Sequence, residues 1–171
     1  GLSMTGLLLG LLAALAITAK AQKISFAQMA DIVCVPAGLA VCLLRLGEQF
    51  TDLGVGKAIE PSAITDAMPW LFLQSRMGKA IEFRLNVWAY EAVAGIVIFG
   101  LTLLIYHRLK KNRGDTALFF CLIFGATQIL LESMRDDGHM LVIFLRIGQV
   151  TAALLVLTAW IVLAHRWRSQ Y

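Results

Sequence analysis

The chain alternates between long apolar runs and short clusters of charged residues. Residues 1–19 carry no ionisable side chain, and four more apolar runs follow at residues 24–44, 88–106, 115–134 and 140–164. About 20 apolar residues cross the hydrocarbon core of a bilayer as a helix, whereas a membrane barrel needs strands that alternate apolar and polar side chains. The pattern therefore predicts an all-α, polytopic transmembrane helix bundle with about five spans.

Residues 47–85 interrupt this pattern. The segment is mixed in polarity and contains Pro61 and Pro69, so it is expected to be an external segment between the second and third spans. Within it, residues 67–72, which include Trp70, are apolar enough to lie along the membrane surface as a short amphipathic element. No internal repeat is present, and residues 1–171 are expected to form a single integral membrane domain.

The composition agrees with a membrane protein. Hydrophobic residues make up 59% of the chain and charged residues 15%, against about 45–50% and about 25% in soluble domains. Basic residues gather in loops 20–23 and 106–114 and after residue 164, which all lie on one side of a five-span bundle. Because basic residues in short loops mark the cytoplasmic side, we expect an inner-membrane protein with a cytoplasmic C-terminus. The net charge of +4 thus reflects topology, and no nucleic-acid partner is expected.

The cysteines predict no metal centre. Cys34, Cys42 and Cys121 all fall inside expected spans, and their spacing matches no metal-binding motif. They are expected to act as small apolar packing residues, and neither a metal nor a cofactor is expected.

Ionisable residues in or beside the spans are candidate functional groups, because placing a charge in the bilayer costs free energy. They are Asp31, Arg45, Glu48, Glu91, Glu132, Arg135 and Arg146. The members of the pairs Arg45–Glu48 and Glu132–Arg135 are three residues apart, so each pair can neutralise itself on one helix face. Arg146 has no such neighbour, which favours a lipid phosphate or another helix as its partner. Pro36 and Gly38 are expected to allow a local opening of the second span.

Several short motifs occur in order along the chain. They are Ser25-Phe26 through Asp31, Arg45-Leu46-Gly47, Gly56-Lys57, Tyr90-Glu91, Gly114, Phe120 to Gly125, Leu131-Glu132 with Arg135, and Ile147-Gly148-Gln149. In this order they resemble motifs of the prolipoprotein diacylglyceryl transferase family, nearly from end to end. Members of that family have seven spans, so the resemblance implies that this chain holds the last five and that two N-terminal helices are absent.

The resemblance implies a reaction as well as a fold. The family transfers a diacylglyceryl group from phosphatidylglycerol to the cysteine thiol of a prolipoprotein signal peptide, and glycerol phosphate leaves without help from a metal. By this resemblance the lipid headgroup is expected at Arg45, Gly47, Glu48, Gly56 and Arg146. Supporting roles are expected for Tyr90, Glu91, Glu132 and Arg135. The oligomeric state is not predicted.

The chain also departs from the family pattern. Thr5 stands where a histidine is expected, Phe124 where a tyrosine is expected, and Gln128 where an arginine is expected. Glu48 replaces an asparagine and Leu85 another histidine, so the catalytic residues are not identified. Three hypotheses remain open: a divergent transferase, a non-catalytic lipid-binding homologue that has lost the active site, and a small transporter. The last lacks the inverted repeats or paired broken helices that are typical of transporters.

Overall fold

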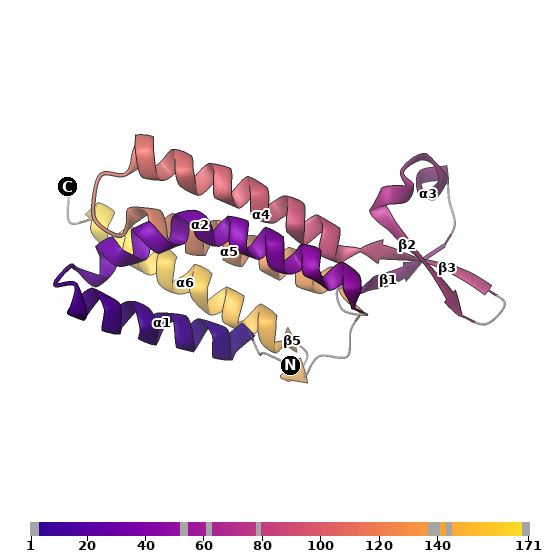
Figure 1. Cartoon of the computed structure of the whole chain (residues 1–171), viewed down its shortest axis with the longest axis horizontal. Helices are drawn as coiled ribbons and strands as arrows, with labels where there is room; N and C mark the ends of the chain where they lie inside the picture. The colour runs from indigo at the N-terminus through magenta and orange to yellow at the C-terminus, as the bar shows by residue number, and fades with distance from the viewer. Residues whose placement is uncertain are drawn as a thin grey trace.

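The computed structural model describes residues 4–51, 55–60, 63–77, 80–136, 141–142 and 145–168. Long helices run roughly side by side, and a small sheet extends from one end of them (Figure 1). We call this end of the bundle the sheet end and the other the opposite end. The C-terminus lies at the opposite end.

Five long helices form the bundle. They are α1 (Met4–Ala21), α2 (Phe26–Gly47), α4 (Val87–Leu104), α5 (Asp115–Met134) and α6 (Ile147–Arg168). Within the described residues, four of these helices are long and apolar enough to cross a membrane, while the apolar part of α1, Leu9–Ala21, is shorter. The predicted all-α polytopic bundle is therefore confirmed, and the chain is a multi-pass membrane protein.

The bundle is held together by small residues. Most of its buried apolar residues are small: Ala19, Ala30, Cys42, Ala92, Ala152 and Ala159. Many leucines, isoleucines and valines of the same helices are exposed, as expected where lipid replaces water around the bundle. Small residues let membrane helices approach closely and gain dispersion energy along their backbones.

Helices α2 and α4 each have a local feature that sets them apart from a regular α-helix. Ser25 caps the start of α2 by accepting a hydrogen bond from the backbone N–H of Gln28 at 3.3 Å. The helix then continues through Pro36, so the local opening expected there is wrong. At the opposite end α4 passes into a π-helical turn, η3 (Ile105–Leu109).

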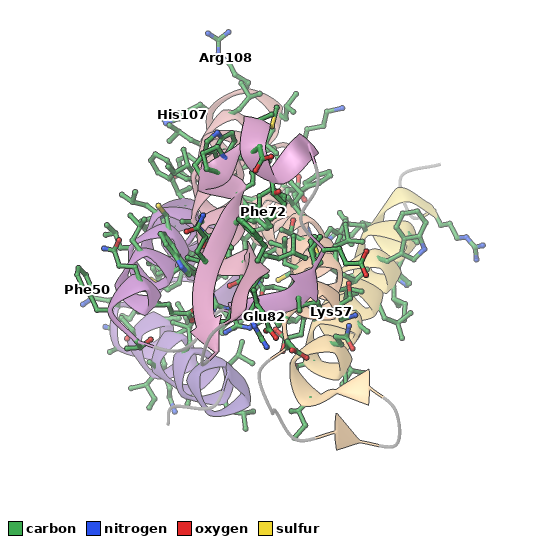
Figure 2. The ribbon with its side chains drawn as sticks, turned by 90° about the vertical axis from the view of Figure 1, so that its right-hand side faces the viewer. Phe50, Lys57, Phe72, Glu82, His107 and Arg108 are labelled. Atoms are coloured by element: carbon green, nitrogen blue, oxygen red, sulfur yellow. The ribbon has the colours of Figure 1, made fainter. Side chains whose placement is uncertain are left out.

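The segment between α2 and α4, which was expected to be external, folds into a sheet that the apolar pattern did not predict. After the 3-10 turn η1 (Glu48–Phe50), the chain forms β1 (Val55–Ile59), α3 (Ala63–Ala67), η2 (Pro69–Leu71), β2 (Phe72–Met77) and β3 (Ala80–Asn86). The strands are antiparallel in the order β1-β3-β2. Residues 67–72, expected to be one short amphipathic element, are thus divided among the end of α3, the turn η2 and the first residue of β2. Figure 2 looks onto this end of the molecule, with Phe50 on the flank of the bundle and Phe72 and Glu82 on the sheet.

The last helix begins later than the apolar run predicts. Its first turn starts at Ile147, whereas the run starts at residue 140. Before it lies a short antiparallel pair, β4 (Leu141–Val142) and β5 (Leu145–Arg146). Apolar residues that open a span can form a strand pair when they lie at the end of the bundle, so hydropathy alone does not fix this boundary.

Candidate functional site

Two glycines bring α2 and α4 into backbone contact. A Cβ atom on Gly38 would lie 2.5 Å from the backbone nitrogen of Phe99, and one on Gly95 would lie 2.7 Å from that of Cys42. The helices run in opposite directions, so the chain moves toward the sheet end from Gly38 to Arg45 and from Gly95 back to Glu91. This crossing therefore places the side chains of Arg45 and Glu91 beside each other at the sheet end.

Four charged side chains form a cluster at the sheet end. The carboxylate Oε2 of Glu91 accepts from Nε of Arg45 at 2.9 Å and from Nη1 of Arg135 at 3.0 Å. Glu48 pairs through Oε1 with Nη1 of Arg45, and its Oε2 lies 3.5 Å from Nη2 of Arg135. We call these residues, Arg45, Glu48, Glu91 and Arg135, the outer cluster. Its two guanidinium groups and two carboxylates alternate, so its formal charge is zero.

Burial divides the outer cluster into an inner and an accessible pair. The side chains of Glu91 and Arg135 are 0% and 4% exposed, whereas those of Arg45 and Glu48 are 20% and 16% exposed. A buried charge has to be paired or it loses its hydration without compensation, which explains why Glu91 contacts two arginines. A ligand that reaches this site from the membrane surface therefore meets Arg45 and Glu48 first.

Strand β1 fixes the position of Arg135. Arg135 ends α5 and forms an isolated antiparallel bridge with Gly56, and the next residue, Asp136, donates its backbone N–H to the Val55 carbonyl at 3.1 Å. Gly56 has no room for a side chain, because a Cβ atom there would lie 2.5 Å from Cβ of Leu85. The register of β1 with β3 shifts at this point, as a bulge requires. Because Gly56 has no side chain, strand β1 can pack directly against the end of α5.

Tyr90 belongs to a neighbouring contact. Its hydroxyl donates a hydrogen bond to the carbonyl of Leu71, and the side-chain amide of Asn86 donates to the carbonyl of Trp70 at 3.4 Å. Both acceptors lie in η2, which is therefore tied to the first turn of α4. Tyr90 positions η2 in this way, while the next residue, Glu91, points into the outer cluster.

One face of α5 continues from the outer cluster into the bundle. Glu132 is buried, and Gly148 at the start of α6 makes room for it, since a Cβ there would lie 3.3 Å from the carboxyl carbon. Gln128 is buried one turn further in, and its Oε1 has no hydrogen-bond partner among the described residues. Phe124 stacks on Phe120 with ring centroids 5.3 Å apart.

Two candidate side chains lie outside the described part of the structure. Thr5 is in α1 and Arg146 is in β5, and only their backbones are described. Gly47 is the last residue of α2, with no heavy atom within 4 Å of an added Cβ. The candidate residues Arg45, Glu48, Glu91 and Arg135 thus come together, and Gly56 contacts this group through its backbone.

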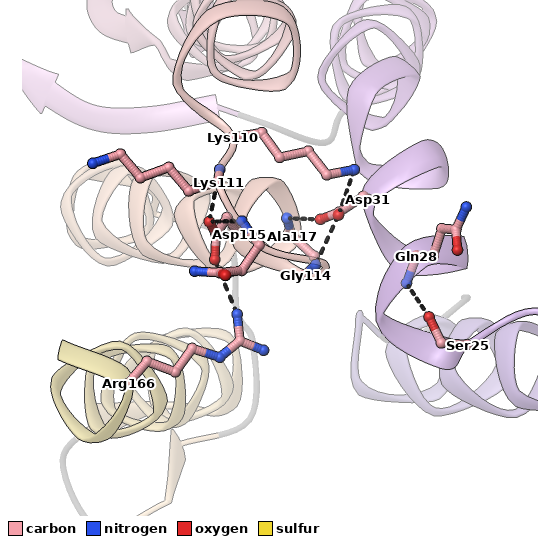
Figure 3. Close-up of polar contacts among 10 residues, drawn as sticks. Ser25, Gln28, Asp31, Lys110, Lys111, Gly114, Asp115, Ala117 and Arg166 are labelled. Carbon is pink, nitrogen blue, oxygen red and sulfur yellow. Dashed lines mark hydrogen bonds and ion pairs between the residues drawn. The ribbon is translucent and has the colours of Figure 1, made fainter. Parts of the chain in front are cut away.

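A second polar cluster lies at the opposite end (Figure 3). The buried carboxylate of Asp31 in α2 accepts from the backbone N–H groups of Gly114 and Ala117 at 2.7 and 3.0 Å, and from Lys110 at 2.9 Å. Asp115 accepts from Arg166 of α6 at 2.9 Å. A carboxylate beside the first turn of a helix satisfies free N–H groups and complements the helix dipole. Asp31, a candidate functional group by sequence, therefore caps α5 and joins it to α2.

Sequence spacing indicated only part of the outer cluster. The separation of three residues predicts the Arg45–Glu48 pair, which the structure confirms. Contacts of Glu91 with Arg45 and Arg135 cross 46 and 44 residues of chain, so no local spacing reveals them. The available signal was weaker: each of these residues is ionisable and close to the same end of an expected span.

Comparisons with known proteins agree with this architecture. Residues 1–165 match the family model described as prolipoprotein diacylglyceryl transferase. A phosphatidylglycerol–prolipoprotein diacylglyceryl transferase of Symbiobacterium thermophilum is 30% identical over 167 residues, which are 96% of this chain and 60% of that protein. Proteins of the same name from Bacillus velezensis and Pasteurella multocida are 28% and 30% identical, with coverage of 100% and 99% of this chain and 63% and 61% of theirs.

The chain thus spans about 60% of the length of these curated relatives, all of them bacterial. The family match extends over nearly the whole chain and includes every helix of the outer cluster. On this evidence the chain belongs to the prolipoprotein diacylglyceryl transferase family.

Proposed function

We propose that this protein transfers the diacylglyceryl group of phosphatidylglycerol to the cysteine of a prolipoprotein. The names of the curated relatives support this activity, and the outer cluster is the structural observation on which the proposal rests. Two arginines converge there at the end of a membrane bundle, at the depth where α2 ends and α4 begins. Lipid headgroups lie at this depth of a bilayer.

Arg45 is the proposed contact for the phosphate of the donor lipid. Its side chain is partly exposed, and its planar guanidinium can donate two parallel hydrogen bonds to phosphate oxygens. Arg135 lies behind it and adds positive potential without needing direct contact. Gly47 leaves the approach to Arg45 open, Gly56 holds the backbone of Arg135, and Arg146 is proposed as a further phosphate contact from β5.

The proposed chemistry needs positive charge where the leaving group departs. The cysteine thiolate attacks a glyceryl carbon, a C–S bond forms, and the C–O bond to the phosphate breaks, so that glycerol phosphate leaves with the electron pair. Arginines placed at those oxygens stabilise the charge that develops there. The thiol must lose its proton first, since the thiolate is the nucleophile.

Two positions at which this chain departs from the family pattern cannot supply the base that removes this proton. The Phe124 ring has no lone pair that can accept a proton and the Gln128 amide does not titrate, so neither serves as a base. Glu91, Glu132 and Tyr90 are proposed as supporting residues that hold the arginines and the η2 turn in place. The contribution assigned to this chain is thus binding and charge stabilisation.

The proposed orientation places the sheet end outside. Lys20, Lys23, Arg108, Lys111 and Arg168 all lie at the opposite end of the bundle, and basic residues near span ends mark the cytoplasm. The C-terminus is accordingly proposed to be cytoplasmic. Residues 1–171 are proposed to form one integral membrane domain in the bacterial inner membrane, with the prolipoprotein signal peptide as partner.

A mass assay tests the activity. Membranes from cells that express the protein from its complete gene are mixed with phosphatidylglycerol and a prolipoprotein signal peptide that carries a free cysteine. We expect the peptide to gain the mass of one diacylglyceryl group, and the gain to disappear when the cysteine is replaced by serine. A folded protein that yields no such product, beside an active relative, would contradict the proposal and favour the non-catalytic lipid-binding homologue.

A further inference from the structure

The two carboxylates of the outer cluster are held unequally. Glu91 has a fully buried side chain and contacts both arginines at 3.0 Å or less. Glu48 is 16% exposed, and it contacts Arg45 closely but Arg135 only at 3.5 Å. One oxygen of each acid, Oε2 of Glu48 and Oε1 of Glu91, has no hydrogen-bond partner among the described residues, so exposure and the distances to the arginines distinguish the two. Of the two acids, Glu48 is therefore the one that can leave its arginines.

Arg45 presents different edges to these acids. Its Nε donates to Glu91, while its Nη1 pairs with Glu48. A guanidinium uses the same N–H donors for a carboxylate and for a phosphate. The carboxylate is planar and the phosphate tetrahedral, but each presents two oxygens at a spacing that fits one edge of the guanidinium. The Glu48 carboxylate thus occupies an edge of Arg45 that a lipid phosphate would need, and Glu91 keeps Arg45 in place from the other side.

The backbone allows Glu48 to release this edge. The residue lies in the three-residue turn η1, where its N–H is bonded to the Arg45 carbonyl and its own carbonyl accepts from Thr51 at 3.0 Å. These bonds involve main-chain atoms of Glu48, so a rotation of its side chain breaks none of them. The preceding residue, Gly47, adds no side chain that would obstruct the movement.

We propose that Glu48 is an exchangeable internal anion: its carboxylate occupies the phosphate-binding edge of Arg45 until the headgroup of the donor lipid displaces it. This inference rests on the proposed function, because it concerns the same headgroup site. Binding is then an exchange of one anion for another on Arg45. Glu48 consequently sets the affinity for anionic lipid without touching the reacting atoms, and is a specificity-determining residue.

Removal of its charge tests this role. The protein, expressed from its complete gene and purified in detergent, is titrated with phosphatidylglycerol, and the bound lipid is counted by native mass spectrometry. Glu48→Gln keeps the shape of the side chain but binds a guanidinium more weakly, so we expect the affinity for phosphatidylglycerol to rise about tenfold, the value of one charge-assisted hydrogen bond. Glu48→Asn is the second variant if Glu48→Gln does not fold.

Matched measurements separate this role from a general charge effect. Glu82→Gln removes a carboxylate from the same end of the molecule, in β3, and should leave the affinity unchanged. Uncharged diacylglycerol should bind equally to the parent and to Glu48→Gln. An affinity for phosphatidylglycerol that is the same in the parent and in Glu48→Gln overturns the role of Glu48 and leaves the proposed function standing. Absence of phosphatidylglycerol from both proteins overturns both proposals.

Discussion

Glu91 is the residue on which the outer cluster depends. It is buried in the first turns of α4, and it holds one arginine from α2 and one from the end of α5 through the same oxygen. Without it, both arginines would share the partly exposed Glu48 as the remaining carboxylate of the outer cluster. The geometry of the proposed headgroup site is therefore set by a carboxylate that the ligand itself does not meet.

Neutralising Glu91 should destabilise the protein. Glu91→Gln removes the carboxylate that lies 3.0 Å from the buried Arg135 and leaves that of Glu48 at 3.5 Å, and breaking a buried ion pair by removing one partner costs up to about 3–5 kcal/mol. The temperature of unfolding in detergent, measured by light scattering or tryptophan fluorescence, should fall by several degrees. Glu82→Gln, whose carboxylate is 41% exposed, is the control and should change stability by less than about 1 kcal/mol. Equal melting temperatures for the two variants would contradict the role of Glu91.

Residue type and spacing could predict only some of these roles. Ionisable groups in an apolar setting pointed to Arg45, Glu91 and Arg135; the structure brings these side chains together, and their functional roles stay predictions. The same criterion also selected Asp31, which caps a helix at the opposite end of the bundle. The cost of burying a charge indicates that the charged residue has a structural or functional role. Which role it has depends on its partner, and the partner is known only from the tertiary fold.

At the scale of elements, the α2–α4 crossing determines where the site forms. Gly38 and Gly95 remove the side chains from the contact, so each helix meets the backbone of the other. A similar close approach joins α5 to α6, where a Cβ on Gly125 would lie 2.6 Å from the Val156 side chain. Gly6 and Gly10, which are four residues apart in α1, have no such neighbour in the described structure.

A methyl group at the crossing should separate the two helices. Gly95→Ala places a Cβ atom 2.7 Å from a backbone nitrogen of α2, and overpacking of this kind costs about 1–3 kcal/mol. We expect a lower melting temperature and weaker lipid retention, since Arg45 moves away from Glu91. Gly100→Ala, in the same helix with open space around it, should be neutral or slightly stabilising. If both substitutions had the same effect, close packing would not be what positions the site.

Hydropathy predicted the helices well and the external segment poorly. Residues 115–134 form α5 with the predicted bounds, because the run ends sharply at charged residues on both sides. The sheet was not predicted, since β1, β2 and β3 are short and mixed in polarity, and the pairing of β1 with β3 joins residues far apart in the sequence. Burial of β1 against the end of α5 stabilises it, and that contact exists only in the folded bundle.

At the scale of the whole molecule, the two ends of the bundle differ in charge and in role. The opposite end has an excess of basic over acidic residues, and it has two buried aspartates that join α2, α5 and α6. The sheet end carries the charge-balanced outer cluster beneath the sheet. Such asymmetry is what a protein needs when it is inserted in one direction and acts on lipid from one side of the membrane.

Thiol labelling tests this orientation. In a background with Cys34, Cys42 and Cys121 replaced by alanine, Asp66→Cys places an exposed thiol in α3 and Asn112→Cys one in the loop before α5. A membrane-impermeant maleimide added to spheroplasts should label residue 66 at once and residue 112 only after the membrane is disrupted. The reverse result would show that the sheet end faces the cytoplasm.

The central claim is that the outer cluster binds the donor lipid of a diacylglyceryl transferase, and the transfer rate of an Arg45 variant tests it most directly. Arg45→Ala is compared with Arg108→Ala, which removes an arginine from η3 at the opposite end of the bundle (Figure 1), where its exposed side chain projects away from the ribbon (Figure 2). We predict that Arg45→Ala lowers formation of the diacylglyceryl peptide at least about a hundredfold, as loss of a transition-state charge contact does, and that Arg108→Ala leaves it unchanged. Equal rates for the two folded variants would contradict the account and place the headgroup site elsewhere in the protein.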